Sequence, residues 1–448
     1  MGKFRFLHAA DVHLGSMLHM EGAGDPALIR YCREATYMAF ERLCRITADS
    51  DARFLLISGD LYDRESRSVR ANRFFADACE KLDRKGIGVY VIAGNHDPIR
   101  EYQEMFALPP NVHIFRADEP EICYVEEDGE ILAGIVGQSY QKKWESAAMH
   151  RGFPAPDGGC FAIAMLHTQM DADDKKYVPC TVGELAGNPS IHYWALGHIH
   201  QPAVLKGDKP VIAYSGIPQG RDFGEEGPGG CWLVEVDGTE ITDMRYLMTS
   251  PVIFQSVPID IGCTELREAE NLSRLEEYMA GYARNMQSEF PALPGRGISP
   301  VYPQGAGKPE GYIVRWILTG RGNLHHILSG DRPEIGRELC ETLRDRLSGL
   351  EPFVWTDSMD IRTGSPATED ILNQHKVLRD LLEQSIRSID RDEGARERFL
   401  HELGQIWTTS RDQEEQDDRK LTLDEEAFRA ILEDARQLLI ENLAAEGE

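Results

Sequence analysis

The chain has 448 residues, of which 42% are hydrophobic and 27% are charged. This composition is ordinary for globular domains and excludes wholesale disorder, and the length predicts about three domains. Acidic residues outnumber basic ones by 75 to 48, so the formal net charge is -27. Such a charge argues against attachment to nucleic acid through bulk charge, although bound divalent metal ions can reverse the local field within a site.

The nine cysteines are scattered along the chain and form no C-x-x-C pair. This pattern favours reduced thiols in the cytoplasm over a disulfide framework or a structural zinc site. No run of 18 apolar residues occurs, and residues 1–6 lead into the first motif without an apolar signal stretch. We therefore expect a cytoplasmic protein with no membrane attachment.

The first 250 residues alternate short apolar runs with helical patterns. Runs rich in β-branched and aromatic residues occupy 4–10, 54–58, 89–93, 160–166 and 193–196. Helical patterns at 28–49 and 67–85 separate the first three runs, which predicts parallel strands of an α/β sheet. Two later runs around Asp237 and Gly238 predict an antiparallel hairpin, so we expect the sheet to be mixed.

The rhythm changes near Pro251. Strands are predicted at 253–261, 312–318 and 353–362, with helices at 264–287 and 333–347 and a loop rich in proline and glycine at 291–311. Only helical patterns follow residue 365. The predicted domains are therefore 1–250, a smaller α+β domain at 251–364 and a helical appendage at 365–448.

Polar side chains that can bind metal follow each of the five N-terminal strands. Because the carboxyl ends of parallel strands share one edge of a sheet, we expect these residues to meet in a single cleft. Oxygen and imidazole donors without thiolate suit manganese, iron or zinc. Seven candidates are too many for one tetrahedral ion but suit two ions that share a carboxylate, clamp a phosphate and activate a water for in-line attack. The candidates are Asp11, His13, Asp60, Asn95, His167, His198 and His200.

Each of these motifs alone is weak evidence. A D-x-H or G-D sequence arises by chance in most proteins, and a lone histidine at a strand end is more often a core or surface residue. The sequence G-N-H-D at 94–97 is rarer, and the ordered set at successive strand ends outweighs the alternative of unrelated polar residues. Gly59, Gly94 and Gly197 fit this interpretation, because glycine lets the backbone turn sharply beside a ligand.

The five motifs, in this order, resemble the signature of the calcineurin-like metallophosphoesterases. Three segments look more specific, because FLHAADVHLG at 6–15, GDLYD at 59–63 and YWALGHIH at 193–200 resemble the SbcD-type DNA repair exonucleases. The segment YSGIPQGR at 214–221 is similar to the YhaO-type branch of that group. The resemblance implies an α/β fold, a mixed-sheet sandwich with a smaller α+β capping domain and a helical C-terminal segment.

The resemblance also implies a role for each motif residue. His96 would lie beside the scissile phosphate, stabilise its developing charge and protonate the leaving 3′ oxygen, and Asp97 would orient the His96 imidazole. Asp63 lies where some relatives carry histidine and others aspartate, so it is a weaker candidate for a role in the site. One metal ion would be held by Asp11, His13 and His200 and the other by Asn95, His167 and His198, with Asp60 bridging.

The function implied by the resemblance is DNA repair in the cytoplasm. The chain would be a Mn2+-dependent DNA phosphodiesterase with 3′ to 5′ exonuclease and single-strand endonuclease activity, with Fe2+ or Zn2+ as the alternative metals. It would form a homodimer and have an SMC-like ATPase as its partner. One alternative is a calcineurin-like phosphodiesterase that acts on a small nucleotide or a lipid headgroup. Another is a non-catalytic DNA-end-binding subunit of an ATPase complex, and the intact set of ligand types counts against it.

Several arginines have more than one interpretation. Arg221, in a glycine-rich loop, would either contact phosphate or stabilise its own turn. Arg64, Arg67, Arg70 and Arg73 recur every three residues and define one helical face. This face could follow a DNA backbone or, as the resemblance implies, meet a second subunit, but we favour pairing with nearby acidic residues in a solvated surface.

Tyr193 and Trp194 precede a ligand on a predicted strand, which favours core packing over base stacking. The last helical segment carries apolar residues at spacings of three and four, which predicts an amphipathic face. This face either packs on the rest of the chain or, as the resemblance implies, docks on the coiled-coil base of an ATPase. Its members are Leu421, Leu423, Phe428, Ile431, Leu432, Ala435, Leu438 and Leu439.

Overall fold

A computed structural model describes most of the chain. The described residues are 2–21, 26–63, 66–101, 105–156, 159–170, 176–286, 298–303, 308–366 and 376–392, and beyond these 394–396, 398, 399, 428, 429, 431, 432, 435, 436 and 439. The chain divides into two compact units. One comprises Met1–Ser256, Ala283–Arg315 and Leu347–Asp357, and the other comprises Val257–Tyr282, Trp316–Arg346 and Ser358–Glu448. Within the described residues we find no helix with the length and apolar character that a bilayer crossing requires.

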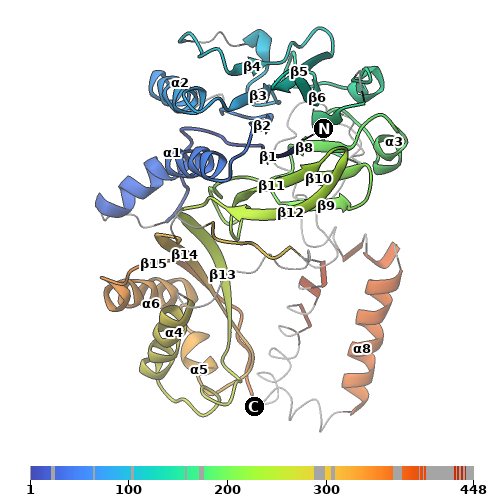
Figure 1. Ribbon diagram of the computed structural model, residues 1–448. Helices are drawn as coiled ribbons and strands as arrows, with labels where there is room; N and C mark the ends of the chain where they lie inside the picture. The colour runs from blue at the N-terminus through green and yellow to red at the C-terminus, as the bar shows by residue number, and fades with distance from the viewer. Residues whose placement is uncertain are drawn as a thin grey trace. The chain divides into compact units, whose positions relative to one another are not determined.

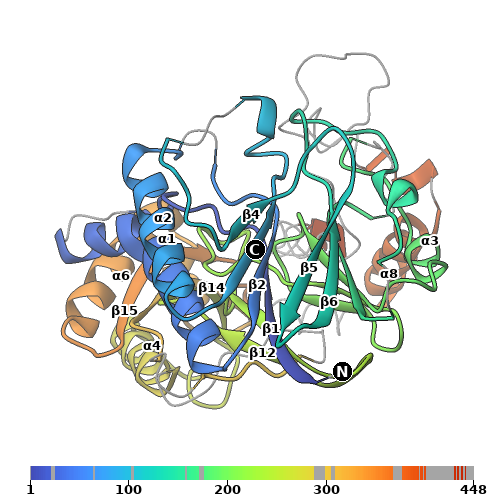
Figure 2. The same ribbon diagram turned by 45° about the horizontal axis from the view of Figure 1, so that its top comes forward.

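The first unit contains two six-stranded sheets, and the first of these carries the strands of the first three motifs (Figure 1). Its strand order is β12, β11, β1, β2, β3, β4. Strands β1 to β4 are parallel, and β11 and β12 form the predicted antiparallel hairpin at one edge. Helices α1 and α2 lie side by side against this sheet (Figure 2). The bounds are β1 Lys3–Ala9, α1 Pro26–Asp49, β2 Phe54–Ser58, α2 Val69–Asp83, β3 Gly88–Ile92, β4 Val112–Ile114, β11 Gly230–Asp237 and β12 Glu240–Met248.

The second sheet carries the strands of the last two motifs. Its strand order is β5, β6, β7, β8, β10, β9, with a parallel centre and an antiparallel strand at each edge. The 3-10 turn η2 and the short helix α3 lie in its connections, whereas the 3-10 turn η1 lies between β3 and β4 of the first sheet. The bounds are η1 Ile99–Glu101, β5 Glu121–Glu127, β6 Glu130–Gly137, η2 Met149–Gly152, β7 Phe161–His167, α3 Val182–Ala186, β8 Tyr193–Gly197, β9 Ala203–Lys206 and β10 Val211–Tyr214.

Alternating side chains build the core on both faces of the sheets. In β2, Phe54 and Leu56 pack between the two sheets, whereas Leu55 and Ile57 pack in the core formed with α1 and α2. This alternation follows from the period of two residues along a strand. Every residue of β2 is buried, which explains why the run is continuously apolar rather than alternating. The mixed α/β sandwich expected from the sequence is therefore confirmed.

The expectation that all the motifs meet at the edge of one sheet is wrong. Strands β1, β2 and β3 belong to one sheet, and β7 and β8 belong to the other. The sheets pack face to face through the shared core, so the carboxyl ends of both sets of strands meet at the same end of the sandwich. Apolar runs alone do not distinguish one sheet from two, because strands in either arrangement are buried on both faces.

A three-stranded sheet of order β13, β14, β15 follows, and its strands begin in the first unit and continue in the second. The helix predicted at 264–287 begins later, at Leu272, because Cys263 O accepts from Leu266 N and Arg267 N and closes a turn. Of the predicted 291–311 loop, residues 291–297 and 304–307 lie outside the described part of the chain. The bounds are β13 Val252–Asp260, α4 Leu272–Met286, β14 Gly311–Thr319, α5 His325–Leu328, α6 Arg332–Leu347, β15 Phe353–Ile361 and α8 Lys376–Arg391.

The C-terminal amphipathic face is described only in part. Phe428 and Leu432 are buried, whereas Leu439 is exposed. The Phe428 ring packs against Phe399 and lies 3.9 Å from the guanidinium carbon of Arg396. Leu421, Leu423 and Leu438 lie outside the described residues.

Candidate metal centre

The motif residues sit in strained backbone where the strands end. Asp11, His13, Asp60 and His198 all have positive φ, of 50°, 44°, 49° and 97°. L-residues other than glycine rarely adopt this region, at a cost of about 1–3 kcal/mol each, and they persist there only where the surrounding structure holds them. Four such residues at adjoining strand ends therefore mark this edge as a functional site, independently of any sequence motif.

The three motif glycines form a close-fitting cradle around His167. A Cβ atom would lie 2.1 Å from His167 Nδ1 at Gly59, 2.8 Å from its Nε2 at Gly94 and 3.0 Å from its Nδ1 at Gly197. Of these three, only Gly59 has a positive φ, of 98°. The expected sharp turn therefore explains Gly59. Gly94 and Gly197 are needed for close packing, because a Cβ atom would lie 2.2 Å from Asp60 Oδ1 at Gly94 and 1.9 Å from the carbonyl oxygen of Ser58 at Gly197.

Asp11, His13 and His200 form the first ligand group, with donor atoms that lie within 4.8 Å of one another. His13 Nε2 lies 3.3 Å from His200 Nε2, which in turn lies 3.9 Å from an Asp11 oxygen. The Asp11 carboxylate also accepts from the backbone N–H of His198 at 3.0 and 3.1 Å. The first sheet supplies Asp11 and His13 after β1, and the second sheet supplies His200 after β8.

Asn95, His167 and His198 form the second group. Asn95 Oδ1 lies 2.9 Å from His167 Nε2 and 3.0 Å from His198 Nδ1. Asp60 adjoins this group, because its Oδ2 lies 3.3 Å from His167 Nε2. Asp60 also forms a three-residue cluster with Asp11 and His167. It is thus placed between the two groups, and all seven predicted ligands converge.

The chemistry of these donors fits divalent cations. A carboxylate lies against Nδ1 of both His13 and His200, so each ring carries its proton there and directs the Nε2 lone pair inward. The Nε2 lone pairs of His13 and His200 then face each other at 3.3 Å, beside the buried carboxylate of Asp11. These electron-rich groups repel one another unless a cation lies among them. Imidazole, carboxylate and amide oxygen donors without thiolate suit Mn2+, Fe2+ or Zn2+.

Burial and ion pairing set the ionisation of the ligands. Burial raises the pKa of Asp11 to about 6 and lowers the pKa of His198 to about 3. Burial opposes the charges of Asp60 and His167 as well, but their mutual attraction holds the pKa of Asp60 below its usual range and raises the pKa of His167 to about 9. Without a cation His167 therefore keeps its proton, and a cation that binds Nε2 displaces it.

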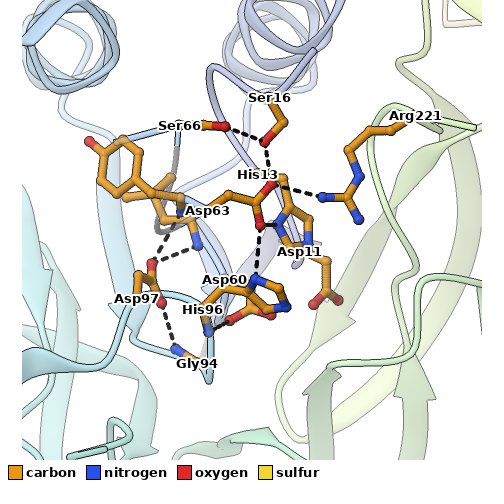
Figure 3. Close-up of polar contacts among 12 residues, drawn as sticks. Asp11, His13, Ser16, Asp60, Asp63, Ser66, Gly94, His96, Asp97 and Arg221 are labelled. Atoms are coloured by element: carbon orange, nitrogen blue, oxygen red, sulfur yellow. Dashed lines mark hydrogen bonds and ion pairs between the residues drawn. The ribbon is translucent and has the colours of Figure 1, made fainter. Parts of the chain in front are cut away.

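Asp63 contacts four side chains beside the first ligand group (Figure 3). Its Oδ1 lies 2.6 Å from His13 Nδ1 and 2.9 Å from His96 Nδ1. Its Oδ2 accepts from Ser16 Oγ and, at 2.9 Å, from Arg221 Nη1. The hydrogen bond to Asp63 raises the pKa of His96. The side chain of His96 is 43% exposed, so substrate can reach it.

The expected pairing of Asp97 with His96 is wrong. The buried carboxylate of Asp97 accepts from the backbone N–H groups of Leu61 at 2.8 Å, Tyr62 at 3.2 Å and Gly94 at 2.8 Å. It thereby ties the turn after β3 to the turn after β2, and Asp63 takes the position beside His96 that the sequence assigned to Asp97. Burial, together with the nearby charge of Asp60, raises the pKa of Asp97 to about 7.

Arg221 forms ion pairs with two carboxylates. Of the two roles expected from the sequence, these contacts favour stabilisation of its own turn over contact with phosphate. Besides Asp63, it pairs with Glu225, whose Oε1 lies 2.5 Å from Arg221 Nη2. The same oxygen of Glu225 lies 2.6 Å from His200 Nδ1. Glu225 was not predicted from the sequence, because it lies in an irregular loop without a recognised motif, although its spacing of four from Arg221 was a signal.

Two arginines of the face formed by Arg64, Arg67, Arg70 and Arg73 form the ion pairs with acidic residues that we favoured from the sequence. Arg70 forms an ion pair with Glu34 of α1, and Arg73 forms one with Asp77 at 3.2 Å. Arg67 lies over the Tyr62 ring at 5.0 Å. Arg64 lies outside the described residues.

Tyr193 and Trp194 are at most 1% exposed, which confirms core packing. The indole N–H of Trp194 donates to the carbonyl of Leu185 at 3.2 Å.

Comparison with known proteins agrees with this geometry. The family model described as calcineurin-like phosphoesterase matches residues 4–202. Over 369 residues the chain is 30% identical to the uncharacterized metallophosphoesterase YhaO of Bacillus subtilis strain 168, covering 81% of this chain and 82% of the relative. The chain belongs to the calcineurin-like metallophosphoesterase family. It is therefore a phosphoesterase hydrolase of a family that depends on two metal ions, and the resemblance drawn from the motifs is confirmed.

Other relatives of this metallophosphoesterase carry nuclease or repair names. It is 26% identical to the DNA double-strand break repair protein Mre11 of Methanocaldococcus jannaschii, over 59% of this chain and 68% of the relative. It is also 26% identical to a subunit of the nuclease SbcCD of Bacillus subtilis strain 168, over 50% of this chain and 62% of the relative.

Proposed function

We propose that this metallophosphoesterase is a DNA phosphodiesterase of DNA repair, with 3′ to 5′ exonuclease and single-strand endonuclease activity. The observation that carries the proposal is the contrast between buried ligands and an accessible histidine. Asp11, Asp60 and His167 are at most 1% exposed, whereas the side chain of His96 is 43% exposed. A phosphodiester can therefore reach His96 from solvent while the ligands beneath it stay fixed.

The residues around His96 fit an acid that assists departure of the 3′ oxygen. Two divalent cations in the ligand groups would supply positive charge to the phosphate and an activated water. Asp63 holds Nδ1 of His96, which makes Nε2 the nitrogen available to substrate. The raised pKa of His96 favours its protonated form, which can stabilise charge on the phosphate and donate a proton to the leaving oxygen. Asp97 fixes the turn that carries His96.

DNA is our preferred substrate because of the names of the relatives, which include a DNA double-strand break repair protein and a nuclease subunit. Mn2+ is our preferred metal, since the donors are oxygen and imidazole. The alternative substrates are a small nucleotide or a lipid headgroup. The remaining alternative is a non-catalytic DNA-end-binding subunit.

We extend the proposal to assembly and location. The chain would work as a homodimer with an SMC-like ATPase partner, and the name of one relative, which describes a subunit of a nuclease, supports a multi-subunit enzyme. Residues 251–364 would form a capping domain that restricts which DNA enters, and 365–448 a helical appendage. All nine cysteines are free thiols, which supports a reducing compartment such as the cytoplasm.

The test is cleavage of end-labelled linear and single-stranded DNA by the purified full chain with Mn2+. We expect cleavage by the parent and loss in Asp60→Ala and His96→Ala, with metal binding retained in the histidine variant. His113→Ala is the matched control, because His113 of β4 is similarly exposed and also pairs with a carboxylate, Glu121, but belongs to neither ligand group. Turnover of bis-p-nitrophenyl phosphate without DNA cleavage would favour a small substrate. Metal binding without turnover of either would support the non-catalytic alternative.

A further inference from the structure

The two histidines of the first ligand group are held from behind by two carboxylates. Asp63 Oδ1 lies 2.6 Å from His13 Nδ1, and Glu225 Oε1 lies 2.6 Å from His200 Nδ1. Arg221 joins these carboxylates: Nη1 donates to Asp63 at 2.9 Å, and Nε and Nη2 donate to Glu225 at 3.1 and 2.5 Å. We call Asp63, Arg221 and Glu225 the carboxylate clamp. Their side chains are only 9–16% exposed, so solvent screens their interaction weakly.

The loop that carries the clamp is folded tightly enough to fix its geometry. Arg221 N donates to Glu225 Oε2 at 2.8 Å, and Arg221 O accepts from His19 N at 2.7 Å. A Cβ atom at Gly220 would lie 2.4 Å from the carbonyl oxygen of Glu225. Guanidinium presents several donors in one plane, so a single arginine can hold two carboxylates at a fixed separation. A lysine, with one nitrogen, matches this geometry less well.

The second ligand group has weaker charged support among the contacts that the structure describes. His167 Nδ1 lies 3.0 Å from the carbonyl oxygen of Ser58, a neutral acceptor, and 4.0 Å from an Asp11 oxygen, which is beyond hydrogen-bond distance. His198 uses Nδ1 toward Asn95, and its ring packs on that of Tyr177 with 4.6 Å between centroids. The two groups therefore differ in what contacts the far side of their imidazoles: two largely buried carboxylates at hydrogen-bond distance in the first group, and a carbonyl oxygen and an aromatic ring in the second.

We propose that the carboxylate clamp makes the Asp11, His13 and His200 site the tighter of the two metal sites and the first to fill. A carboxylate behind an imidazole fixes the ring and makes the opposite nitrogen a stronger donor, and loss of such a partner typically lowers metal affinity about 10- to 100-fold. Arg221 and Glu225 are positioning residues, because they act on the metal through His200 and Asp63. The proposal rests on the ligand assignment of the proposed function but not on the choice of DNA as substrate.

The first test uses the unaltered protein. After removal of metal with EDTA, Zn2+ is added in steps while the imidazole resonances are followed by NMR. We expect one equivalent to shift the resonances of His13 and His200, and a second equivalent to shift those of His167 and His198. Filling in the reverse order, or of both sites together, would overturn the proposal.

The second test removes parts of the clamp. Calorimetric titration with Mn2+ should give two binding events in the parent. Glu225→Gln and Arg221→Met should weaken the tighter event about 10- to 100-fold and leave the weaker one unchanged, whereas Arg221→Lys should restore part of the loss. Asp222→Asn is the matched control, because this neighbouring carboxylate accepts from Gly224 N, which an amide oxygen can also do, and its charge attracts Arg221 less than those of Glu225 and Asp63 do. Unfolding in EDTA identifies any variant that fails to fold, and the NMR titration of the parent does not depend on such variants.

The outcomes separate this proposal from the proposed function. Equal weakening of both events in Glu225→Gln, or no weakening of either, would contradict the clamp. If metal fills the Asp11, His13 and His200 site first but the protein cleaves no DNA, the result would support the role of the clamp and refute the proposed substrate. Absence of any metal binding by the parent would refute both.

Discussion

Replacing Gly197 with alanine should disrupt the strand ends that carry the site. The new Cβ would lie 1.9 Å from the carbonyl oxygen of Ser58 and 2.9 Å from Cβ of Ala10. The first distance is about 1.4 Å short of the closest ordinary C···O approach of about 3.3 Å. The Ser58 carbonyl belongs to the backbone of β2, and the Cβ of Ala10 has no torsion by which it could turn aside, so β8 must move away from β2.

The expected cost has two parts. Overpacking of this kind costs about 1–3 kcal/mol. Displacing the Ser58 carbonyl also weakens its contact with His167 Nδ1, now 3.0 Å, at about 1 kcal/mol. We therefore expect the free energy of unfolding to fall by about 2–4 kcal/mol, measured by urea denaturation in EDTA, and the second ligand group to bind Mn2+ more weakly in calorimetry.

Gly207→Ala is the matched control, because the nearest atom to its new Cβ, Val204 Cγ1, is 3.9 Å away. This variant should unfold like the parent. If Gly197→Ala retained the parent's stability within about 0.5 kcal/mol and bound two metal ions with unchanged affinities, the close packing of these strand ends would not support the site as argued.

Three further predictions concern the charges of the site. Asp63→Asn should lower kcat on bis-p-nitrophenyl phosphate about 10- to 100-fold. It should also move the alkaline limb of the pH profile of kcat to lower pH, because Asp63 raises the pKa of His96. An alkaline limb at the same pH as in the parent would exclude this role of Asp63. Burial lowers the pKa of His8 from 6.5 to about 3, so the unfolded chain binds a proton that the folded chain excludes and stability falls as pH drops below 6.5. Between pH 7 and pH 5 this loss is about 2 kcal/mol, and urea denaturation of His8→Asn should show a pH dependence smaller by that amount. Mn2+ at about 100 times its Kd should stabilise the chain by about 2.7 kcal/mol per site relative to EDTA, and equal melting temperatures with and without Mn2+ would argue that the ligand groups hold no metal.

The sequence predicted the strands well because each is a short, continuously apolar run. The predicted starts and ends of β1, β2 and β8 lie within one residue of those observed. The ligands could be located because each follows one of these runs directly. The separation into two sheets followed only from the family resemblance and not from the apolar runs, since a buried strand has the same composition in either arrangement.

The contacts among the polar residues were harder to predict than their positions. Asp63 and Asp97 each lie three residues beyond a motif glycine or ligand, and only the turn geometry decides which carboxylate faces His96. In the structure Asp97 is used by backbone N–H groups, which leaves Asp63 for the imidazole. The role of Glu225 depends on a loop whose path follows from contacts distant in sequence, and apart from its spacing of four from Arg221 no pattern marks it.

Each ligand group takes residues from both sheets of the sandwich. Asp11 and His13 follow a strand of one sheet and His200 a strand of the other, and Asn95 and His167 are divided in the same way. Bound cations would therefore act as cross-links that fasten the two layers at the open end of their shared core. Loss of metal would free that edge for local unfolding and expose it to proteases, so the supply of metal in a cell would govern the amount of this enzyme as well as its activity.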